Sequence, residues 1–200
     1  MRIISGLARG SRLFAPPARS RAIRPTSDRA REALFSIIGS RVGNSHVLDL
    51  FAGTGALGCE ALSRGAHSVT FVDNSRQALL LVQRNSELIP GGGQRSRIIQ
   101  HDLKRSLPFA GDHSSALHPF DLVFADPPYQ QGFTEKILFF LDKSSVLAQK
   151  VLIILEEKKG VQIGVKLDNL FLEKNRCYGD SCFHFFMRKP LPTPEDLKIP

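Results

Sequence analysis

The sequence predicts an α/β protein in which helices cover both faces of an open, mostly parallel sheet. Three observations support this prediction: short apolar runs alternate with helical patterns, a glycine-rich turn follows the first long run, and two strand-like segments close the chain. The 200 residues fit one domain with a small appendage, and 42% hydrophobic residues are enough for a core.

The predicted strands and helices alternate along the chain. Strands are expected from Val47 to Leu50 and at 68–73, 97–100, 120–125, 151–155, 170–178 and 182–188. Helices are expected after Leu57 and at 75–88 and 133–142. The last two strands would form an antiparallel hairpin through Gly179-Asp180. In such a sheet, ligands bind outside the carboxyl ends of the parallel strands.

Residues 1–40 are predicted to form a basic extension docked on a main domain of residues 41–189, with a loose tail at 190–200. Strands at 2–6 and 11–15 would make a hairpin that turns at Arg9-Gly10. A helix would begin at Thr26 or Ser27 and end at Gly39. Its apolar stripe would comprise Ala30, Ala33, Leu34, Ile37 and Ile38, with Arg29, Arg31, Glu32 and Phe35 off the stripe.

Positive charge is concentrated before the first strand of the main domain. Nine arginines in this part face only two acids, so it carries +7 of the formal net charge of +8. Arginine suits bidentate phosphate contacts, which favours a nucleic acid partner over a merely solvated basic arm. The predicted contact residues are Arg9, Arg12, Arg19, Arg21, Arg24 and Arg29.

Cysteine and histidine usage argues against disulfides and metals. The three cysteines form no Cys-x-x-Cys pair, and the six histidines lack metal-binding spacing, so we expect neither a disulfide framework nor a metal site. This cysteine usage is simplest in a reducing cytoplasm, where we expect the protein as a monomer. No apolar run reaches about 18 residues, so we expect no membrane span. The arginine-rich start resembles an organelle transit peptide in composition, but its turn signals favour folded structure.

The glycines follow the spacing Gly53-x-Gly55-x-x-Gly58 directly after the first main strand. This pattern fits a dinucleotide site, a site for S-adenosylmethionine (SAM) or a packing turn without a ligand. Asp49 favours SAM, because a carboxylate near the helix start would repel a pyrophosphate but attract a sulfonium and an ammonium. The alternative is that Asp49 only caps the turn.

Four carboxylates follow or end predicted parallel strands and would share one edge of the sheet. They are Asp49, Asp73, Asp102 and Asp126. Asp73 lies twenty residues beyond Gly53, where an acid can accept hydrogen bonds from ribose hydroxyls. The predicted cofactor-binding residues are Asp49, Phe51, Gly53, Gly55, Asp73 and Asp102.

The turn Asp126-Pro127-Pro128-Tyr129 is the most discriminating motif. Its prolines stiffen the backbone, so the Asp126 carboxylate and the Pro127 carbonyl can accept both protons of one exocyclic amine. Tyr129 offers a face on which a base can stack. The alternative is a proline turn that merely ends a strand. We predict that these four residues form the catalytic site.

Together, the glycine loop and the Asp-Pro-Pro-Tyr turn resemble amino-methyltransferases with the Rossmann-like class I fold. The chain is most similar to bacterial 16S ribosomal RNA guanine-N2 methyltransferases of the RsmD type. The further motifs that carry this resemblance are Arg2-Ile3-Ile4-Ser5-Gly6, Arg9-Gly10, Arg24 to Arg29, Arg31 to Phe35, Glu60 to Ala66 and Tyr178-Gly179-Asp180.

The resemblance implies that the enzyme converts SAM to S-adenosylhomocysteine (SAH) while methylating ribosomal RNA, either free or in the assembling small subunit. It places Asp49, Gly53 and Gly55 at the methionine part of SAM. It also places Asp73 at the ribose, Asp102 at the adenine amine and Asp126 to Tyr129 at the target guanine. A DNA adenine or cytosine amino-methyltransferase is the first alternative. A glutamine-modifying enzyme, a nicotinamide-dependent oxidoreductase and a non-catalytic RNA-binding module explain fewer of the motifs.

Overall fold

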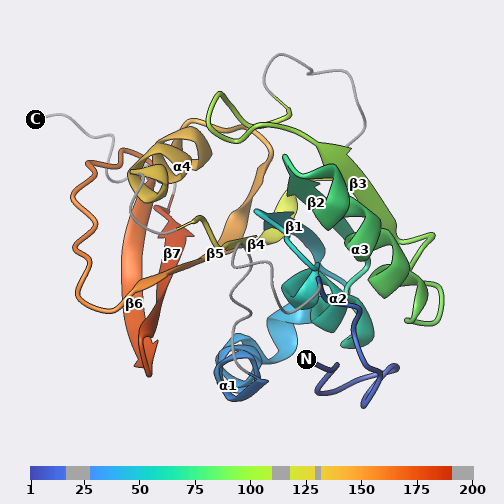
Figure 1. Cartoon of the computed structure of the whole chain (residues 1–200). Coiled ribbons are helices and arrows are strands. Elements are labelled where there is room, and N and C mark those ends of the chain that lie inside the picture. The colour runs from blue at the N-terminus through green and yellow to red at the C-terminus, as the bar shows by residue number, and fades with distance from the viewer. Residues whose placement is uncertain (17–27, 110–117, 129–131, 191–200) are drawn as a thin grey trace, which may run out of the picture.

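The computed structural model describes residues 1–16, 28–109, 118–128 and 132–190, and its strands form one seven-stranded sheet (Figure 1). The strands are β1 (His46–Leu50), β2 (Ser68–Asp73), β3 (Ser96–Gln100), β4 (Phe120–Ala125), β5 (Leu147–Lys158), β6 (Leu170–Tyr178) and β7 (Ser181–Arg188). The helices are α1 (Asp28–Ile38), α2 (Ala56–Ser63), α3 (Arg76–Glu87) and α4 (Phe133–Asp142), and a 3-10 turn, η1 (Gly39–Val42), follows α1.

The strand order is β3-β2-β1-β4-β5-β7-β6, and β7 runs antiparallel to both of its neighbours. The other neighbouring pairs are parallel. This arrangement confirms the predicted α/β fold, including the terminal hairpin. The central strands are apolar along nearly their whole length because helices cover both of their faces.

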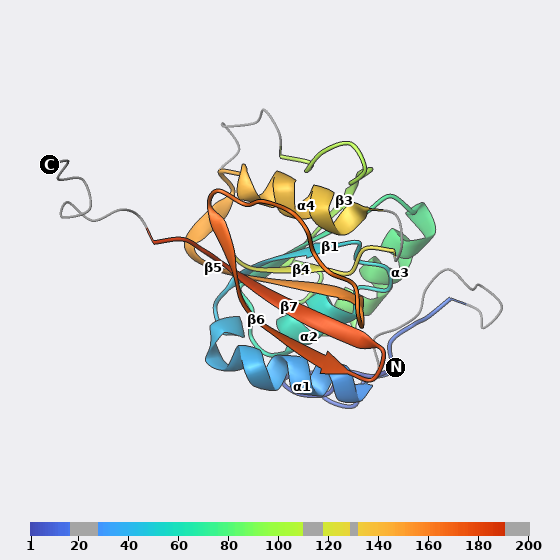
Figure 2. The same cartoon turned by 90° about the vertical axis from the view of Figure 1, so that its left-hand side faces the viewer.

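Helices lie on both sides of the sheet. Figure 2 shows α4 on one face and α1 and α2 on the other. Between the sheet and α1, α2 and α3 the core includes Phe35, Phe71 and Phe124, and between the sheet and α4 it includes Ile137 and Leu141. The two layers therefore fix β1 and β4 from both faces, which makes their carboxyl ends a rigid base for a site.

The N-terminal residues form a shorter hairpin than predicted. Within residues 1–16 the ladder is one antiparallel bridge, between Arg2 and Arg12, and Ile3 also donates to the Ser11 carbonyl and accepts the Gly10 N–H. The segment bonds to α2 as well, where the Leu7 N–H donates to the Ser63 carbonyl at 2.8 Å. A Cβ on Gly6 would lie 1.9 Å from that carbonyl oxygen, so glycine is needed for this close approach. The division of the chain at residues 40 and 189 stays a prediction.

The buried face of α1 also differs from the predicted stripe. Arg31 and Phe35 were expected off the stripe, but their side chains are 0% and 1% exposed. The N-terminal segment covers α1 from a second side, where the Arg31 guanidinium donates to the carbonyl of Arg2. Thr26 and Ser27, the expected helix caps, lie outside the described residues.

The expectation that the cysteines form no disulfide is wrong. A disulfide joins Cys177 and Cys182, which face each other across β6 and β7. Three histidines gather at the amino end of β1, where the His46 ring contacts those of His67 and His118. Their rings pack on each other, and no group of three or more potential ligands in the described ranges is arranged to hold a metal. None of the described helices is both long and apolar enough to cross a membrane.

Candidate active site at the carboxyl ends of the strands

The sheet order brings the four predicted carboxylates to one edge. Asp102 follows β3, Asp73 ends β2, Asp49 is the penultimate residue of β1, and Asp126 follows β4. Because these strands are neighbours in the order β3-β2-β1-β4, the four acids line up side by side along the sheet. The two sequence motifs meet at this edge. Leu50, which precedes the glycine loop, pairs with Ala125, which precedes Asp126, and on its other side with Val72.

The glycine loop between β1 and α2 requires unusual backbone angles. Gly53 and Gly55 have φ values of +55° and +73°, which glycine adopts without strain. Phe51 also has a positive φ, +57°, which is rare for a residue with a side chain and is common at binding sites. A Cβ on Gly58 would lie 2.2 Å from the Phe71 ring and 2.9 Å from the Asp49 carboxylate. The third glycine thus allows α2 to pack tightly on the strands.

Asp49 is buried beneath this loop. Its carboxylate accepts the Gly58 N–H at 2.9 Å, which is the turn-capping contact that the alternative interpretation expected. Burial raises the pKa of Asp49 to about 8, and the negative charge of Asp73 acts in the same direction, while the Gly58 hydrogen bond opposes them. A cationic ligand would stabilise the ionised carboxylate here, so the capping contact and a role in cofactor binding are compatible.

Asp73 holds the loop from the other side. One of its oxygens accepts the Gly53 N–H at 2.9 Å and the other accepts the Ser75 N–H at 2.8 Å. A carboxylate has about four acceptor positions, so it can still bind hydroxyl groups. Asp102 accepts the Lys104 N–H at 3.0 Å and lies 3.5 Å from Arg105. Its side chain is 39% exposed and therefore accessible to a ligand.

Asp126 lies directly beside the end of β1. Its backbone N–H donates to the Leu50 carbonyl at 3.5 Å. Burial raises the pKa of Asp126 well above its ordinary value, and the charges of Glu156, Asp49 and Glu157 raise it further. Pro127 is buried and Pro128 is exposed, whereas Tyr129 lies outside the described residues.

Glu156 and Glu157 are two buried acids that the sequence analysis missed. They are 4% and 5% exposed and belong to β5, which continues three residues beyond the predicted end. Leu155 pairs with Ala125, so Glu156 lies within β5 at the level of Asp126, which follows β4. The Thr134 hydroxyl donates to Glu157 at 2.6 Å. The signal in the sequence was two acids that follow an apolar strand without a turn residue.

The predicted RNA-contact arginines are only partly visible. Arg9, Arg12 and Arg29 are exposed. The three others, Arg19, Arg21 and Arg24, lie outside the described residues.

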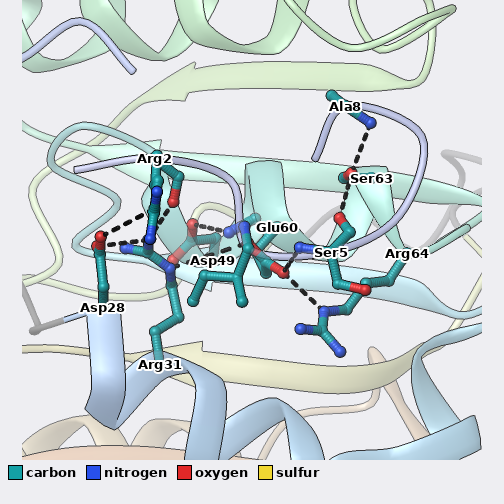
Figure 3. Close-up of polar contacts among 11 residues, drawn as sticks. Arg2, Ser5, Ala8, Asp28, Arg31, Asp49, Glu60, Ser63 and Arg64 are labelled. Atoms are coloured by element: carbon teal, nitrogen blue, oxygen red, sulfur yellow. Dashed lines mark hydrogen bonds and ion pairs between the residues drawn. The ribbon is translucent and has the colours of Figure 1, made fainter. Parts of the chain in front are cut away.

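A buried ionic cluster joins the N-terminal segment to the helix that follows the glycine loop (Figure 3). Glu60 of α2 is 0% exposed and accepts the backbone N–H groups of Ile4 and Ser5 at 2.7 and 3.1 Å. The same carboxylate bonds to Arg64 at 2.7 Å and lies 3.9 Å from Arg31. The segment that carries Arg9 and Arg12 is thus attached to α2 by charged contacts out of water.

The fold and the placement of the two motifs define a methyltransferase of the Rossmann-like class. Over residues 1–187 the sequence matches the model of the family described as Conserved hypothetical protein 95, and the chain belongs to that family. This membership confirms the family resemblance inferred from the sequence.

Named relatives agree with this assignment. Ribosomal RNA small subunit methyltransferase D of Haemophilus influenzae is 35% identical over 80% of this chain and 79% of its own length. Its namesake from Escherichia coli K12 is 31% identical over 94% and 90%. The solved structure of Escherichia coli yhhF has a TM-score of 0.76 and 29% identity, and it covers 96% of this chain and 99% of its own.

Proposed function

We propose that this methyltransferase transfers a methyl group from SAM to the exocyclic N2 amine of a guanine in 16S ribosomal RNA. The observation that carries the proposal is the contact between the two motifs. The backbone N–H of Asp126 reaches the carbonyl of Leu50, which directly precedes the glycine loop. Groups suited to an amine and groups suited to a cationic cofactor therefore lie next to each other. The names of the relatives support ribosomal RNA as the substrate.

The residues present fit SAM. Asp49 supplies a buried carboxylate for the cationic methionine part, next to the backbone of Gly53 and Gly55. Asp73 supplies acceptors for the ribose and Asp102 for the adenine amine, and Phe51 belongs to the same loop. Bound SAM supplies the methyl group on a sulfonium.

The Asp126-Pro127-Pro128-Tyr129 turn is proposed to hold the target amine. The Asp126 carboxylate and the Pro127 carbonyl accept its two protons, which directs the nitrogen lone pair toward the methyl donor. A nitrogen–carbon bond forms as the sulfur–carbon bond breaks, and the nitrogen releases a proton during or after the transfer. Catalysis then depends mainly on alignment. The base must leave its stack to enter this pocket, and Tyr129 is proposed to stack on it.

The exposed arginines are proposed to bind RNA phosphates and to set the register of the substrate. Arg9, Arg12 and Arg29 have this role in the described part of the chain, and Arg19, Arg21 and Arg24 are assigned it from the sequence. The proposal includes a monomeric enzyme that acts in the cytoplasm on free RNA or on the assembling small subunit.

Labelled SAM tests this function with four competing acceptors: naked 16S RNA, assembled small subunits, DNA and protein. We expect label in the ribosomal RNA and N2-methylguanine in its nuclease digest. RNA in which inosine replaces the methylated guanosine lacks the 2-amino group and should accept no methyl group. Label confined to DNA or protein would refute the assignment.

The variant Asp126→Ala should lose methyl transfer and keep SAM binding, as measured by calorimetry. Asp121→Ala is the matched control, because Asp121 is an exposed acid at the opposite end of the same strand. A methyl-transfer rate near that of the wild type in Asp126→Ala would refute the role of Asp126 as the amine acceptor.

A further inference from the structure

The side chain of Asn85 connects the N-terminal segment to the glycine loop. This residue of α3 is 0% exposed. Its Oδ1 accepts the Phe14 N–H at 2.7 Å, and its Nδ2 donates to the carbonyls of Phe14 and Thr54 at 3.0 and 2.8 Å. Thr54 lies between the two loop glycines, Gly53 and Gly55, so one amide group touches both segments.

Every polar group of this side chain is used. An amide offers acceptor positions on its oxygen and two N–H donors on its nitrogen. Aspartate at position 85 could not donate to the two carbonyls, and leucine would leave the buried Thr54 carbonyl and both partly buried groups of Phe14 without this partner. The bridge therefore depends on the chemistry of the amide as well as on its size.

Other contacts fix the same segment relative to the loop. Arg84 precedes Asn85 in α3, and its guanidinium lies 3.9 Å from the centre of the Phe14 ring. At the other end, Ser63 of α2 donates to the Ser5 carbonyl at 2.6 Å and accepts the Ala8 N–H at 3.0 Å (Figure 3). Residues 1–16 are thus bonded to α2 and α3, and α2 begins directly after the glycine loop.

We propose that Asn85 is a positioning residue for methyl transfer, which couples RNA binding on the N-terminal segment to SAM binding in the glycine loop. The inference rests on the proposed function. Arg12 is two residues before Phe14, and Arg9 lies on the same segment, both exposed to a polyanion. A ligand that orders the Thr54 carbonyl also orders Phe14 through the shared amide, so each ligand strengthens the binding of the other.

The test measures the Kd of 16S RNA with and without saturating SAH, which cannot react. For the wild type we expect RNA to bind at least about five-fold more tightly when SAH is present. For Asn85→Ala we expect the two Kd values to agree within about two-fold, because the bridge that carries the coupling is gone. Gln83→Ala is the matched control, since it removes an exposed amide from the same helix and should couple like the wild type.

Two outcomes overturn the inference: equal RNA affinities with and without SAH in the wild type, or wild-type coupling in Asn85→Ala. If Asn85→Ala does not fold, hydrogen exchange of the wild type decides the matter. SAH should slow exchange of the Phe14 amide at least about five-fold, and an unchanged rate contradicts the coupling. If the wild type methylates 16S RNA but SAH does not change its RNA affinity, only the role of Asn85 is refuted. If the wild type never methylates this RNA, the proposed function is refuted.

Discussion

Replacement of Asp49 by asparagine should stabilise the protein at neutral and alkaline pH and weaken its binding of SAM. The side chain is 3% exposed, and burial is the main reason that its pKa rises from 3.8 to about 8. Because the folded protein holds this proton more tightly than the unfolded chain does, ionisation opposes folding. The free energy of unfolding should therefore fall by roughly 1.4 kcal/mol per pH unit as the pH rises from about 4 to about 8.

Asparagine cannot ionise but keeps an oxygen that accepts the Gly58 N–H. The gain in unfolding free energy over the wild type should grow by about 3 kcal/mol between pH 5 and pH 7.5. Urea unfolding at both pH values measures this change, and Asp121→Asn, which alters an exposed acid, is the control. An Asp49→Asn effect that is equal at both pH values would refute the reasoning.

The same pKa links cofactor binding to proton release. A bound sulfonium or ammonium favours the ionised carboxylate, so SAM binding below pH 8 should release a proton from Asp49, and SAM affinity should rise with pH up to about 8. Calorimetry in buffers with different ionisation enthalpies counts that proton. Asp49→Asn should release none from this site and should bind SAM about ten-fold or more weakly.

Three further predictions concern the loop, the buried cluster and the arginines. Asp73→Ala should lower SAM affinity at least about ten-fold by calorimetry, because hydrogen bonds to an ionised acceptor are lost; unchanged affinity contradicts the ribose role. Glu60→Gln should reduce the free energy of unfolding by about 3 kcal/mol in urea, whereas Glu32→Gln on exposed α1 surface should not. Replacing Arg9 and Arg12 by alanine should flatten the salt dependence of RNA binding by about 0.7 to 0.9 in log–log slope per lost contact; an identical slope excludes them.

Local pattern was sufficient to predict most of the fold. Strands β2, β4 and β6 and helix α4 begin and end where apolar runs and turn residues placed them. The longer β5 was not predictable in the same way, because Glu156 and Glu157 are polar in sequence and buried only through neighbouring strands and α4. The disulfide was missed because pairing of Cys177 with Cys182 depends on the register of β6 and β7.

The candidate site was likewise predictable only in part. The loop glycines and the strand-end acids follow from spacing, since parallel strands bring their carboxyl ends to one edge. That Asp73 bonds to Gly53, and that Asn85 bonds to Thr54, depends on how separate elements pack. Asn85 lies at helical spacing from Ala78 and Val82 on the buried side of α3, but a polar residue next to the equally polar Ser86 does not reveal its partners.

Arg31 shows why the total charge before β1 overstates the positive charge that an RNA could contact. The sequence counts it among nine basic residues before β1, yet its side chain is 0% exposed and bonds to Asp28 at 3.0 Å. Its Nε and one terminal nitrogen have no hydrogen-bond partner among the described residues, so its burial is costly and depends on Glu60 and Asp28 for compensation. This arginine therefore attaches α1 to the N-terminal segment and to α2, and RNA binding should depend on the exposed Arg9, Arg12 and Arg29 instead.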